Sequence, residues 1–321
     1  MQRLVEKIKK ISNEKTLIIT HHNADIDAIS SAIALYLGLK QLKIPVSIGV
    51  SESISRPAKK IANDYNILID PDCSKFKNII LVDTSVSEQL KTIKNLRADI
   101  IIDHHPKGDL VNNNISLIDP NKKSCSELIY ALLKKLKINI NKKIAKIILA
   151  GMVADTAHLK LAEKEQFKVI LELLETGVMF SDVLKLLETP QDVSEVIAGL
   201  KAIKNSNLYK IGDLLISFSK IGSHEAYSCR LFIKYGVDIA IVFAIKKNEL
   251  RISSRGKKRI LDLGISLSEI FKEIGHIIDG SGGGHDLAGS ANGKSKNIEE
   301  VEKFILNTIS KKLNKKIKKL Y

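Results

Sequence analysis

The fold of this chain is decided by residues 16–27, which read Thr-Leu-Ile-Ile-Thr-His-His-Asn-Ala-Asp-Ile-Asp. The first five, Thr16–Thr20, are apolar or β-branched and predict a short buried strand that ends where the polar residues begin. An amphipathic helical stretch follows at 28–40, and further strands are predicted at 46–50, 78–82 and 99–102. Short strands that alternate with helices predict an α/β domain whose parallel sheet carries helices on both faces.

The composition predicts a two-domain globular protein. The chain has 321 residues, of which 44% are hydrophobic and 27% are charged, with only 6 Pro and 18 Gly. This excludes disordered, collagen-like and low-complexity classes. The 51 Lys and Arg residues outnumber the 36 Asp and Glu residues, and the net charge of +15 favours a polyanionic partner such as nucleic acid. Lysine-rich composition is also typical of proteins from hot habitats, so charge alone leaves the partner open.

Cysteine usage and hydropathy predict a protein of the reducing cytoplasm. Cys73, Cys125 and Cys229 are odd in number and widely spaced, which excludes a disulfide framework and a CxxC zinc site. The N-terminal residues contain no continuous apolar run of the kind found in signal peptides. The longest fully apolar run, at 239–245, is far shorter than the roughly 20 residues of a membrane helix. We therefore expect a soluble, cytoplasmic protein that does not associate with membranes.

Three segments are expected along the chain. Residues 1–185 form the first domain, residues 186–207 a helical linker broken at Pro190, and residues 208–321 a smaller α/β domain. Helices of the first domain are predicted at 126–136, 142–152 and 163–175. In the second domain strands are predicted at 214–219, 238–245 and 249–254, and helices at 224–235, 267–274 and 298–319. Residues 1–190 hold 28 basic and 22 acidic side chains and residues 191–321 hold 23 and 14, so the second half is the more basic.

Acidic residues and histidines follow the predicted strands of the first domain. They are His21, Asp25 and Asp27 after the first strand, Asp83 after the strand at 78–82, Asp103, His104 and His105 after the strand at 99–102, and Asp155 after the helix at 142–152. Because the carboxyl ends of parallel strands share one edge of the sheet, where ligands bind, these groups are expected to converge. The alternative, that polar residues merely end strands, rests on their frequency in turns.

Carboxylates that converge repel one another unless a cation lies between them. Carboxylate and imidazole ligands without thiolate suit Mn²⁺ best, with Mg²⁺, Co²⁺ or Zn²⁺ as alternatives, and the number of side chains is enough for two ions. Paired divalent ions are a common device for attack on phosphorus, because they activate the nucleophile and neutralise the oxygen charge that develops.

The sequence resembles the DHH phosphoesterase superfamily, which is named after the Asp-His-His motif found here at 103–105. The resemblance includes His-x-x-x-Asp-x-Asp at 21–27, the lone Asp83, and Asp155 in a Gly-x-x-x-Asp-Thr context. Ser-Gly-Gly-Gly-His at 281–285, followed by Ala288-Gly289, resembles the loop of the DHH-associated domain. The family's Asn-Pro-Asp-Gly-Asp reads Asn-Ala-Asp-Ile-Asp at 23–27, so the ligand positions are kept while the loop loses Pro and Gly.

The resemblance implies a role for each of these residues. One metal would be held by His21, Asp25 and Asp83, and the second by Asp27, Asp83, His104 and Asp155, so that Asp83 bridges the two ions. His105 would face the scissile phosphate as hydrogen-bond donor or general acid, and Asp103 would orient a neighbouring histidine. Arg255 matches an arginine that the family uses on substrate phosphate, for which its planar guanidinium is suited.

The glycine-rich stretch also has a physical interpretation of its own. Gly282, Gly283 and Gly284 permit close backbone approach, so their N–H groups are expected to bind an anion in a loop, with His285 as a further donor. A Gly-Lys-Ser/Thr sequence does not follow, which argues against a nucleoside-triphosphate loop. A simple turn, and a plain surface charge at Arg255, are the alternatives. The basic tail at 311–321 is expected to be the end of an amphipathic helix, either solvated or in contact with nucleic acid.

The expected function is a metal-dependent phosphodiesterase that acts from one end of short single-stranded RNA or DNA and releases nucleoside monophosphates. The resemblance points to the short-oligonucleotide nanoRNase group, whose members also act on 3′-phosphoadenosine 5′-phosphate, or to compact relatives of the RecJ exonuclease. Hydrolysis of cyclic or linear dinucleotides, inorganic pyrophosphatase activity, and an inactive scaffold in a replication or repair complex are the alternatives. Whether the protein forms a homodimer, which sugar it prefers and from which end it acts are not readable from these motifs.

Overall fold

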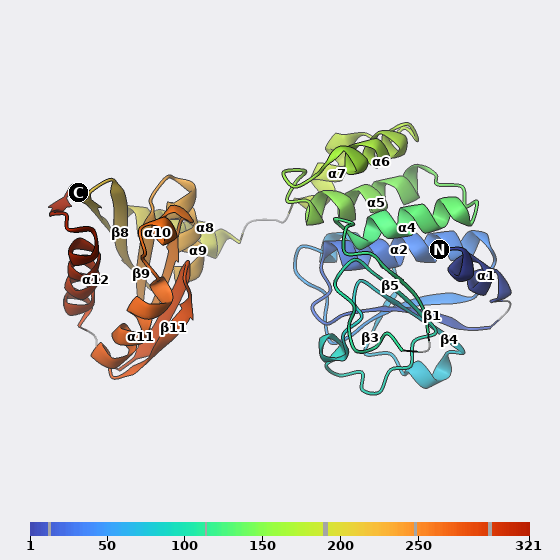
Figure 1. The fold of residues 1–321 in the computed structure, drawn as a ribbon, viewed down its shortest axis with the longest axis horizontal. Helices are drawn as coiled ribbons and strands as arrows, with labels where there is room; N and C mark the ends of the chain where they lie inside the picture. The colour runs from blue at the N-terminus through green and yellow to red at the C-terminus, as the bar shows by residue number, and fades with distance from the viewer. Residues whose placement is uncertain (12–13, 113, 189–191, 247–248, 295–296) are drawn as a thin grey trace. The chain divides into compact units, whose positions relative to one another are not determined.

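The computed structural model describes the chain apart from residues 12–13, 113, 189–191, 247–248 and 295–296 (Figure 1). It divides into two compact units, Met1–Thr189 and Pro190–Tyr321. The predicted break at Pro190 lies outside the described residues. The stretch 186–207, which was expected to be a linker, contains the end of α7 (Phe180–Leu187) in the first unit and all of α8 (Val193–Lys204) in the second.

The first unit is built on a parallel sheet of six strands in the order β3-β2-β1-β4-β5-β6. The strands are β1 (Thr16–Thr20), β2 (Val46–Val50), β3 (Ile67–Ile69), β4 (Asn78–Val82), β5 (Ile100–Asp103) and β6 (Ile115–Ile118). The central strands β1 and β4 are buried along their whole length, as their unbroken apolar runs predict. The parallel α/β fold expected from the alternation of strands and helices is thereby confirmed.

Helices cover one face of this sheet. They are α1 (Gln2–Lys10), α2 (Ile26–Gln41), α3 (Lys59–Ala62), α4 (Cys125–Lys135), α5 (Lys142–Asp155), α6 (Lys164–Leu174) and α7. In Figure 1, α2, α4 and α5 lie together along the sheet, and their apolar residues share one core with alternate residues of the strands, such as Ile18 and Ile80.

The opposite face of the sheet differs from the expectation of helices on both faces. Leu17, Leu81 and Ile101 on this face pack against Leu90 and Leu96, which come from the connections between strands. These connections form two short 3₁₀ helices, η1 (Cys73–Lys75) and η2 (Ser87–Leu90), and loops. The connections after β3 and β4 contain too few apolar residues to form an amphipathic helix. Single apolar side chains from these connections therefore complete the core on this face.

The second unit contains a mixed sheet of seven strands in the order β11-β12-β10-β9-β8-β7-β13. The strands are β7 (Ser206–Ile211), β8 (Leu214–Ile221), β9 (Ile239–Lys246), β10 (Glu249–Gly256), β11 (Gly280–His285), β12 (Ala288–Gly293) and β13 (Ile317–Lys319). Among the strand pairs described in this sheet, β8 and β9 are the pair that runs parallel, because α9 (Glu225–Lys234) connects them. On one face α8 and α9 pack over Ala240 and Val242, and on the other α10 (Arg259–Asp262), α11 (Leu267–Ile277) and α12 (Ile298–Leu313) cover Phe218 and Phe243.

Two expectations for the second unit are corrected by the structure. The last helix ends at Leu313 rather than at 319, because Asn314 adopts a left-handed conformation (φ +50°) and turns the chain into the edge strand β13. The stretch Gly282–His285 is part of the strand β11 in a hairpin with β12, not a flexible loop. At Gly282 a Cβ atom would come within 1.8 Å of the carbonyl oxygen of Phe271 in α11, so glycine is required here for close packing.

Among the described residues, no helix is both long and apolar enough to cross a membrane.

Candidate functional site

Seven side chains gather at the carboxyl ends of the strands of the first unit. They are His21 after β1, Asp25 and Asp27 at the start of α2, Asp83 after β4, His104 and His105 after β5, and Asp155 at the end of α5. The ligand atoms of Asp83, His104 and His105 lie within 4.8 Å of one another, as do those of His21, Asp25 and Asp83, and those of Asp27, His104 and Asp155. The three sets overlap at Asp83 and His104, so all seven side chains form a single cluster.

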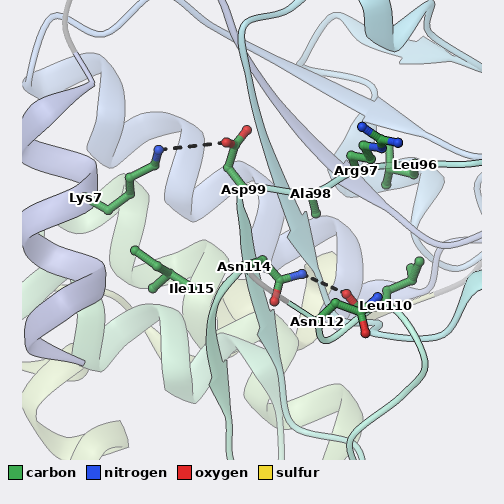
Figure 2. A pocket seen from close by; sticks show the side chains of 9 residues that line it. All are labelled: Lys7, Leu96, Arg97, Ala98, Asp99, Leu110, Asn112, Asn114 and Ile115. Carbon is green, nitrogen blue, oxygen red and sulfur yellow. Dashed lines mark hydrogen bonds and ion pairs between the residues drawn. The ribbon is translucent and has the colours of Figure 1, made fainter.

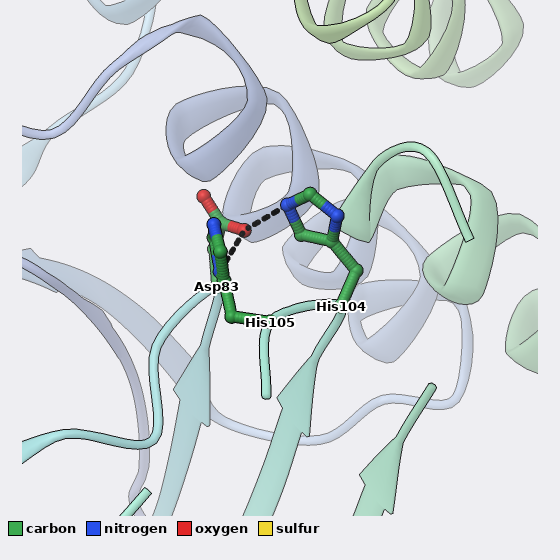
Figure 3. Close-up of side chains that lie close together, drawn as sticks. All are labelled: Asp83, His104 and His105. Atoms are coloured by element: carbon green, nitrogen blue, oxygen red, sulfur yellow. Dashed lines mark ion pairs between the residues drawn. The ribbon is translucent and has the colours of Figure 1, made fainter. Parts of the chain in front are cut away.

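Asp83 lies at the centre of this cluster, where His104 and His105 point toward it (Figure 3). Its Oδ2 is 3.6 Å from Nε2 of His21, and its Oδ1 is 3.5 Å from Nε2 of His104. Asp83 has a φ of +63°, a left-handed conformation that costs a non-glycine residue about 1 to 2 kcal/mol. Strain of this kind is tolerated where it serves a site, and here it aims the carboxylate across the strand ends.

Backbone carbonyl groups fix the orientation of the two histidines beside Asp83. Nδ1 of His21 lies 2.8 Å from the carbonyl oxygen of His22, and Nδ1 of His104 lies 3.3 Å from that of Lys122. Since a carbonyl oxygen only accepts, Nδ1 carries the proton in each ring, and Nε2 turns its lone pair toward the carboxylates. A ring nitrogen held this way is the usual arrangement in histidines that bind metals.

The cluster fits divalent metal ions. Oδ1 of Asp83 and Nε2 of His104 are buried, yet neither has a hydrogen-bond partner in the described part of the chain. Nε2 of His104 lies 3.3 Å from Oδ2 of Asp155 and 3.5 Å from Oδ1 of Asp83 without a hydrogen bond to either, and Nε2 of His21 lies 3.6 Å from Oδ2 of Asp83. Two atoms this far apart can each lie about 2.1 Å from one cation. Buried polar atoms without partners are costly, so a cation between them explains the arrangement.

The electrostatics of the carboxylates in the cluster also favour binding of a cation. Burial, followed by repulsion from Asp27 and Asp25, raises the pKa of Asp83 well above its usual value. The same causes, in the same order, raise the pKa of Asp155 to about 7. Burial likewise raises the pKa of Asp27. The metal-free site therefore resists full ionisation at neutral pH, and divalent cations would relieve the repulsion.

Asp103 and His105 form an ion pair at the mouth of the cluster. Burial opposes ionisation of Asp103, but hydrogen bonds from the ring and the backbone N–H of His105 outweigh it and hold the pKa of Asp103 below its usual value. The hydrogen bond from Nδ1, 2.8 Å from Oδ1 of Asp103, raises the pKa of His105 to about 9. Asp103 is fully buried whereas the side chain of His105 is 55% exposed, so the protonated ring is accessible to a ligand.

The sequence analysis missed the groups that hold Asp27. Its carboxylate accepts hydrogen bonds from the backbone N–H groups of Cys125 (2.5 Å) and Ser126 (3.0 Å) at the start of α4, where a negative charge is favoured. Gly151 of α5 lies against the same carboxylate: a Cβ atom there would come 2.0 Å from Oγ of Ser126 and 2.6 Å from Oδ1 of Asp27. The glycine of the Gly-x-x-x-Asp-Thr motif was the only sequence signal for this contact.

Behind His104, a buried acidic residue supports the loop that orients its ring. Glu127 accepts a hydrogen bond from Nζ of Lys122 at 2.6 Å and another from Nε2 of Gln166 at 2.9 Å. Lys122 is the residue whose carbonyl oxygen accepts from His104. Ser124 and Glu127 have the Ser-x-x-Glu spacing of a helix N-terminus, and Oγ of Ser124 caps the N–H of Glu127, so the sequence did carry a signal for this support.

In the second unit, two of the predicted substrate-binding residues, Arg255 and His285, lie on one face of the sheet, whereas Gly282 lies on the other face, against Phe271 of α11. Ser253 pairs with Ser290, and Ala288 pairs with His285. Since directly paired residues, and residues two apart in a strand, share a face, Arg255 and His285 project from the same side. Ser290 and His285 are exposed and Arg255 is half-buried, so the face can be reached by a ligand.

A pocket of about 600 Å³ in the first unit does not belong to this site (Figure 2). It is lined by Lys7, Asp99, Asn114 and Ile115, among others. Asp99 precedes β5 and Ile115 begins β6, so the pocket lies at the amino ends of these strands, whereas the carboxylate and histidine cluster lies at the carboxyl ends. Lys7 and Asp99 approach to 3.8 Å across it, which partly neutralises their charges.

The fold and the cluster agree with comparisons to known proteins. Residues 15–152 match the N-terminal domain of the DHH family, and residues 224–314 match the DHHA1 domain. The chain therefore belongs to the DHH family of metal-dependent phosphoesterases, and the resemblance read from its motifs is confirmed.

Relatives cover nearly the whole chain. The protein MJ0988 of Methanocaldococcus jannaschii is 34% identical over 98% of this chain and 99% of its own length. A Thermus thermophilus protein named bifunctional oligoribonuclease and PAP phosphatase NrnA is 23% identical over 98% of this chain and 94% of its own. An exopolyphosphatase-related protein from Bacteroides fragilis has the same fold, with a TM-score of 0.67 at 19% identity over 98% and 97% of the two chains.

Proposed function

We propose that this chain is a metal-dependent phosphodiesterase that removes nucleoside monophosphates from one end of short single-stranded RNA or DNA. The observation that carries the proposal is the cluster at the strand ends. In it, the ligand atoms of Asp83 lie within 4.8 Å of those of His21 and Asp25 on one side and of His104 on the other. The relative from T. thermophilus named as an oligoribonuclease and PAP phosphatase supports the choice of short oligonucleotides and small phosphorylated nucleotides.

In this proposal His21, Asp25 and Asp83 hold one divalent ion, and Asp27, Asp83, His104 and Asp155 hold a second. Mn²⁺ is the ion that best suits carboxylate and imidazole ligands, with Mg²⁺ or Co²⁺ as substitutes. When bound, the ions supply a nucleophile active at neutral pH and neutralise charge on the phosphate oxygens. Asp83 would be a ligand of both ions. Its position supports this, because its two carboxylate oxygens face Nε2 of His21 on one side and Nε2 of His104 on the other.

The proton needed by the leaving oxygen would come from His105. Its Nδ1 is held by Asp103, and with a pKa of about 9 the ring carries a proton at neutral pH. Because the ring is half exposed, its other nitrogen can donate to a phosphate or to the oxygen that leaves. Asp103 keeps the ring oriented and ionised, which is a positioning role.

The second unit would bind the substrate through Arg255 and His285. Both project from the face of the sheet that also exposes Ser290, and a guanidinium and an imidazole on one face are suited to bind phosphate. Of the three glycines, Gly283 would let a nucleotide approach the backbone of β11, because a Cβ atom there meets nothing within 4 Å, whereas Gly282 and Gly284 lie against Phe271 and Ala288. Exposure of His285 and Ser290 supports this role.

Turnover of end-labelled strands tests the proposal. Purified protein with Mn²⁺ would be given RNA and DNA of two to twenty nucleotides, labelled at the 5′ or the 3′ end. We expect stepwise release of monophosphates that stops in Asp83→Ala but continues in the control Asp72→Ala, since Asp72 is exposed and its carboxylate contacts its chain neighbours Ser74 and Lys75. Equal turnover by Asp83→Ala would refute the site, and metal binding without turnover of any strand would favour a scaffold.

The face of the second unit needs a separate measurement. His285→Ala and Arg255→Ala are expected to raise KM for oligonucleotides while Mn²⁺ binding stays unchanged. Lys303→Ala, an exposed lysine on α12, is the matched control. Kinetics equal to those of this control would remove both residues from the substrate site.

A further inference from the structure

The edge strand β13 gathers lysines at the edge of the second sheet opposite β11. The chain reads Lys-Lys-Ile-Lys-Lys-Leu-Tyr over 315–321, and every one of these residues is exposed. Six strand spacings of about 4.8 Å separate β13 from β11, which places this lysine edge about 29 Å from the hairpin that carries His285. The lysine edge is therefore distinct from the proposed substrate face.

Two of the lysines oppose each other directly. Lys318 on β13 pairs with Lys210 on β7, so both side chains project from the same face, and Lys316, two residues before Lys318, lies on that side of the chain. Like charges directly opposite one another in a sheet are destabilising. Lys210 has only a distant partner, Asp213 at 3.9 Å, and no ion pair of Lys316 or Lys318 is found in the part of the chain that the structure describes.

Aromatic rings accompany the lysines. Tyr321 follows β13 and is 72% exposed, and its carbonyl oxygen accepts from the N–H of Leu208, which ties this segment to β7. On the other face, Nζ of Lys319 lies 5.9 Å from the ring of Tyr209. Lysines that track a backbone, with an exposed aromatic ring at the same edge of the sheet, are features of surfaces that bind single-stranded nucleic acid.

Lysines at a sheet edge can also serve only to prevent aggregation. Prevention of aggregation does not require two lysines to oppose each other on one face. Such a pairing lowers the stability of the protein unless an anion lies between the two charges. A membrane surface is a poorer partner, because α12 buries its apolar side in the core through Val301 and Ile305 and has no such side to insert into lipid.

We propose that the lysine edge, formed by Lys210, Lys316 and Lys318, is a second binding site for the phosphate backbone of single-stranded nucleic acid. The inference rests on the proposed function, which it extends from short strands to longer ones. A stacked strand rises about 3.4 Å per nucleotide, so at least about nine nucleotides are needed to span from β11 to β13, and more for a strand that passes around α8 and α9. Strands shorter than this would use the substrate face alone, and longer strands would gain affinity from the lysine edge.

Binding without turnover tests this inference. The double variant Lys316→Gln/Lys318→Gln would be compared with Lys9→Gln/Lys10→Gln, which removes the same charge from exposed positions of α1. Fluorescence anisotropy in EDTA would give Kd for a dinucleotide and for a thirty-nucleotide strand at several salt concentrations. Each phosphate contact to a single strand contributes a slope of about 0.7 to log K against log salt, so loss of two contacts should lower the slope by about 1.4.

The expected result is a loss of affinity for the long strand on the order of tenfold at 0.1 M salt, with dinucleotide binding unchanged. A loss no greater than that of the control variant would overturn the inference, as would an equal loss for both lengths. Preferential loss of binding to anionic lipid vesicles would overturn it in favour of a membrane surface. If no strand is hydrolysed by the metal-loaded protein but the lysine-dependent binding persists, the proposed function fails while this inference stands.

Discussion

Replacing Gly151 with alanine tests how tightly α5 packs against the candidate metal centre. In the interior of a helix this change ordinarily stabilises a protein by about 1 kcal/mol, because alanine has the higher helix propensity. Here the added Cβ atom would lie 2.0 Å from Oγ of Ser126 and 2.6 Å from Oδ1 of Asp27, well inside van der Waals contact. An extra methyl group in a packed interior costs about 1 to 3 kcal/mol, so the expected sign is reversed.

We expect a net loss of about 2 kcal/mol, at the upper end of that overpacking cost after the gain in helix propensity is subtracted. For a unit of this size, that corresponds to a fall in Tm of about 4 to 8 °C. Because Asp27 must shift, Mn²⁺ affinity should also fall by about 10- to 100-fold, the usual effect of disturbing groups behind a metal ligand. Thermal unfolding in EDTA and isothermal titration with Mn²⁺ measure the two effects separately.

Gly199→Ala is the matched control. This glycine also lies within a helix, but its Cβ atom would meet only the end of a flexible side chain, Cδ2 of Leu231 at 2.8 Å, and a Tyr227 ring atom at 3.2 Å. It should change stability by less than Gly151→Ala and leave Mn²⁺ binding intact. Adding Ser126→Ala to Gly151→Ala removes the closest contact and should restore part of the loss. A Gly151→Ala protein as stable and as tightly metal-binding as the original would refute the packing described for α5.

Three further predictions concern stability and support of the centre. A carboxyl whose pKa is raised on folding stabilises the protein below its unfolded value near 4, and this stabilisation is lost as pH rises toward 7. Asp155→Asn should therefore flatten the decline of Tm between pH 4 and 7 in EDTA, an effect of at most about 4 kcal/mol. Parallel curves would contradict it. Ala157→Gly should stabilise the protein by up to about 1 kcal/mol, because Ala157 has a φ of +50°, while Ala154→Gly within α5 should destabilise it. Shifts of Tm in the same direction for both variants would be inconsistent with the left-handed turn. Glu127→Gln weakens the hold on Lys122 and should lower Mn²⁺ affinity about tenfold, as titration would reveal, whereas unchanged affinity would make Glu127 a purely structural residue.

The strands and the order of the candidate ligands could be predicted because both depend on local sequence. Thr16–Thr20 and Asn78–Val82 are continuous apolar or β-branched runs, and such runs become central strands of a parallel sheet whatever packs around them. Polar residues at their ends then converge by topology. The spacing of His21, Asp25 and Asp27 was therefore enough to predict the cluster from the sequence.

Predictions failed where a long-range contact overrides local preference. The basic segment at 311–321 has a helical pattern, but Asn314 turns it and pairing with β7 makes residues 317–319 a strand. The glycines at 282–284 suggested a loop, yet the close approach of α11 and pairing with β12 made them a strand. In both cases backbone pairing with a distant segment outweighs the conformational preference of the residues themselves.

By itself, the sequence determined the family, the parallel sheet and which acidic and histidine side chains gather at its edge, because each of these depends on residue type and spacing along one strand or loop. Only the tertiary structure determined that the N–H groups of α4 hold Asp27, that Gly151 leaves room for its carboxylate, and that Lys318 opposes Lys210. These contacts join segments far apart in the chain. Their geometry depends on how helices and strands pack, which no local pattern of residues records.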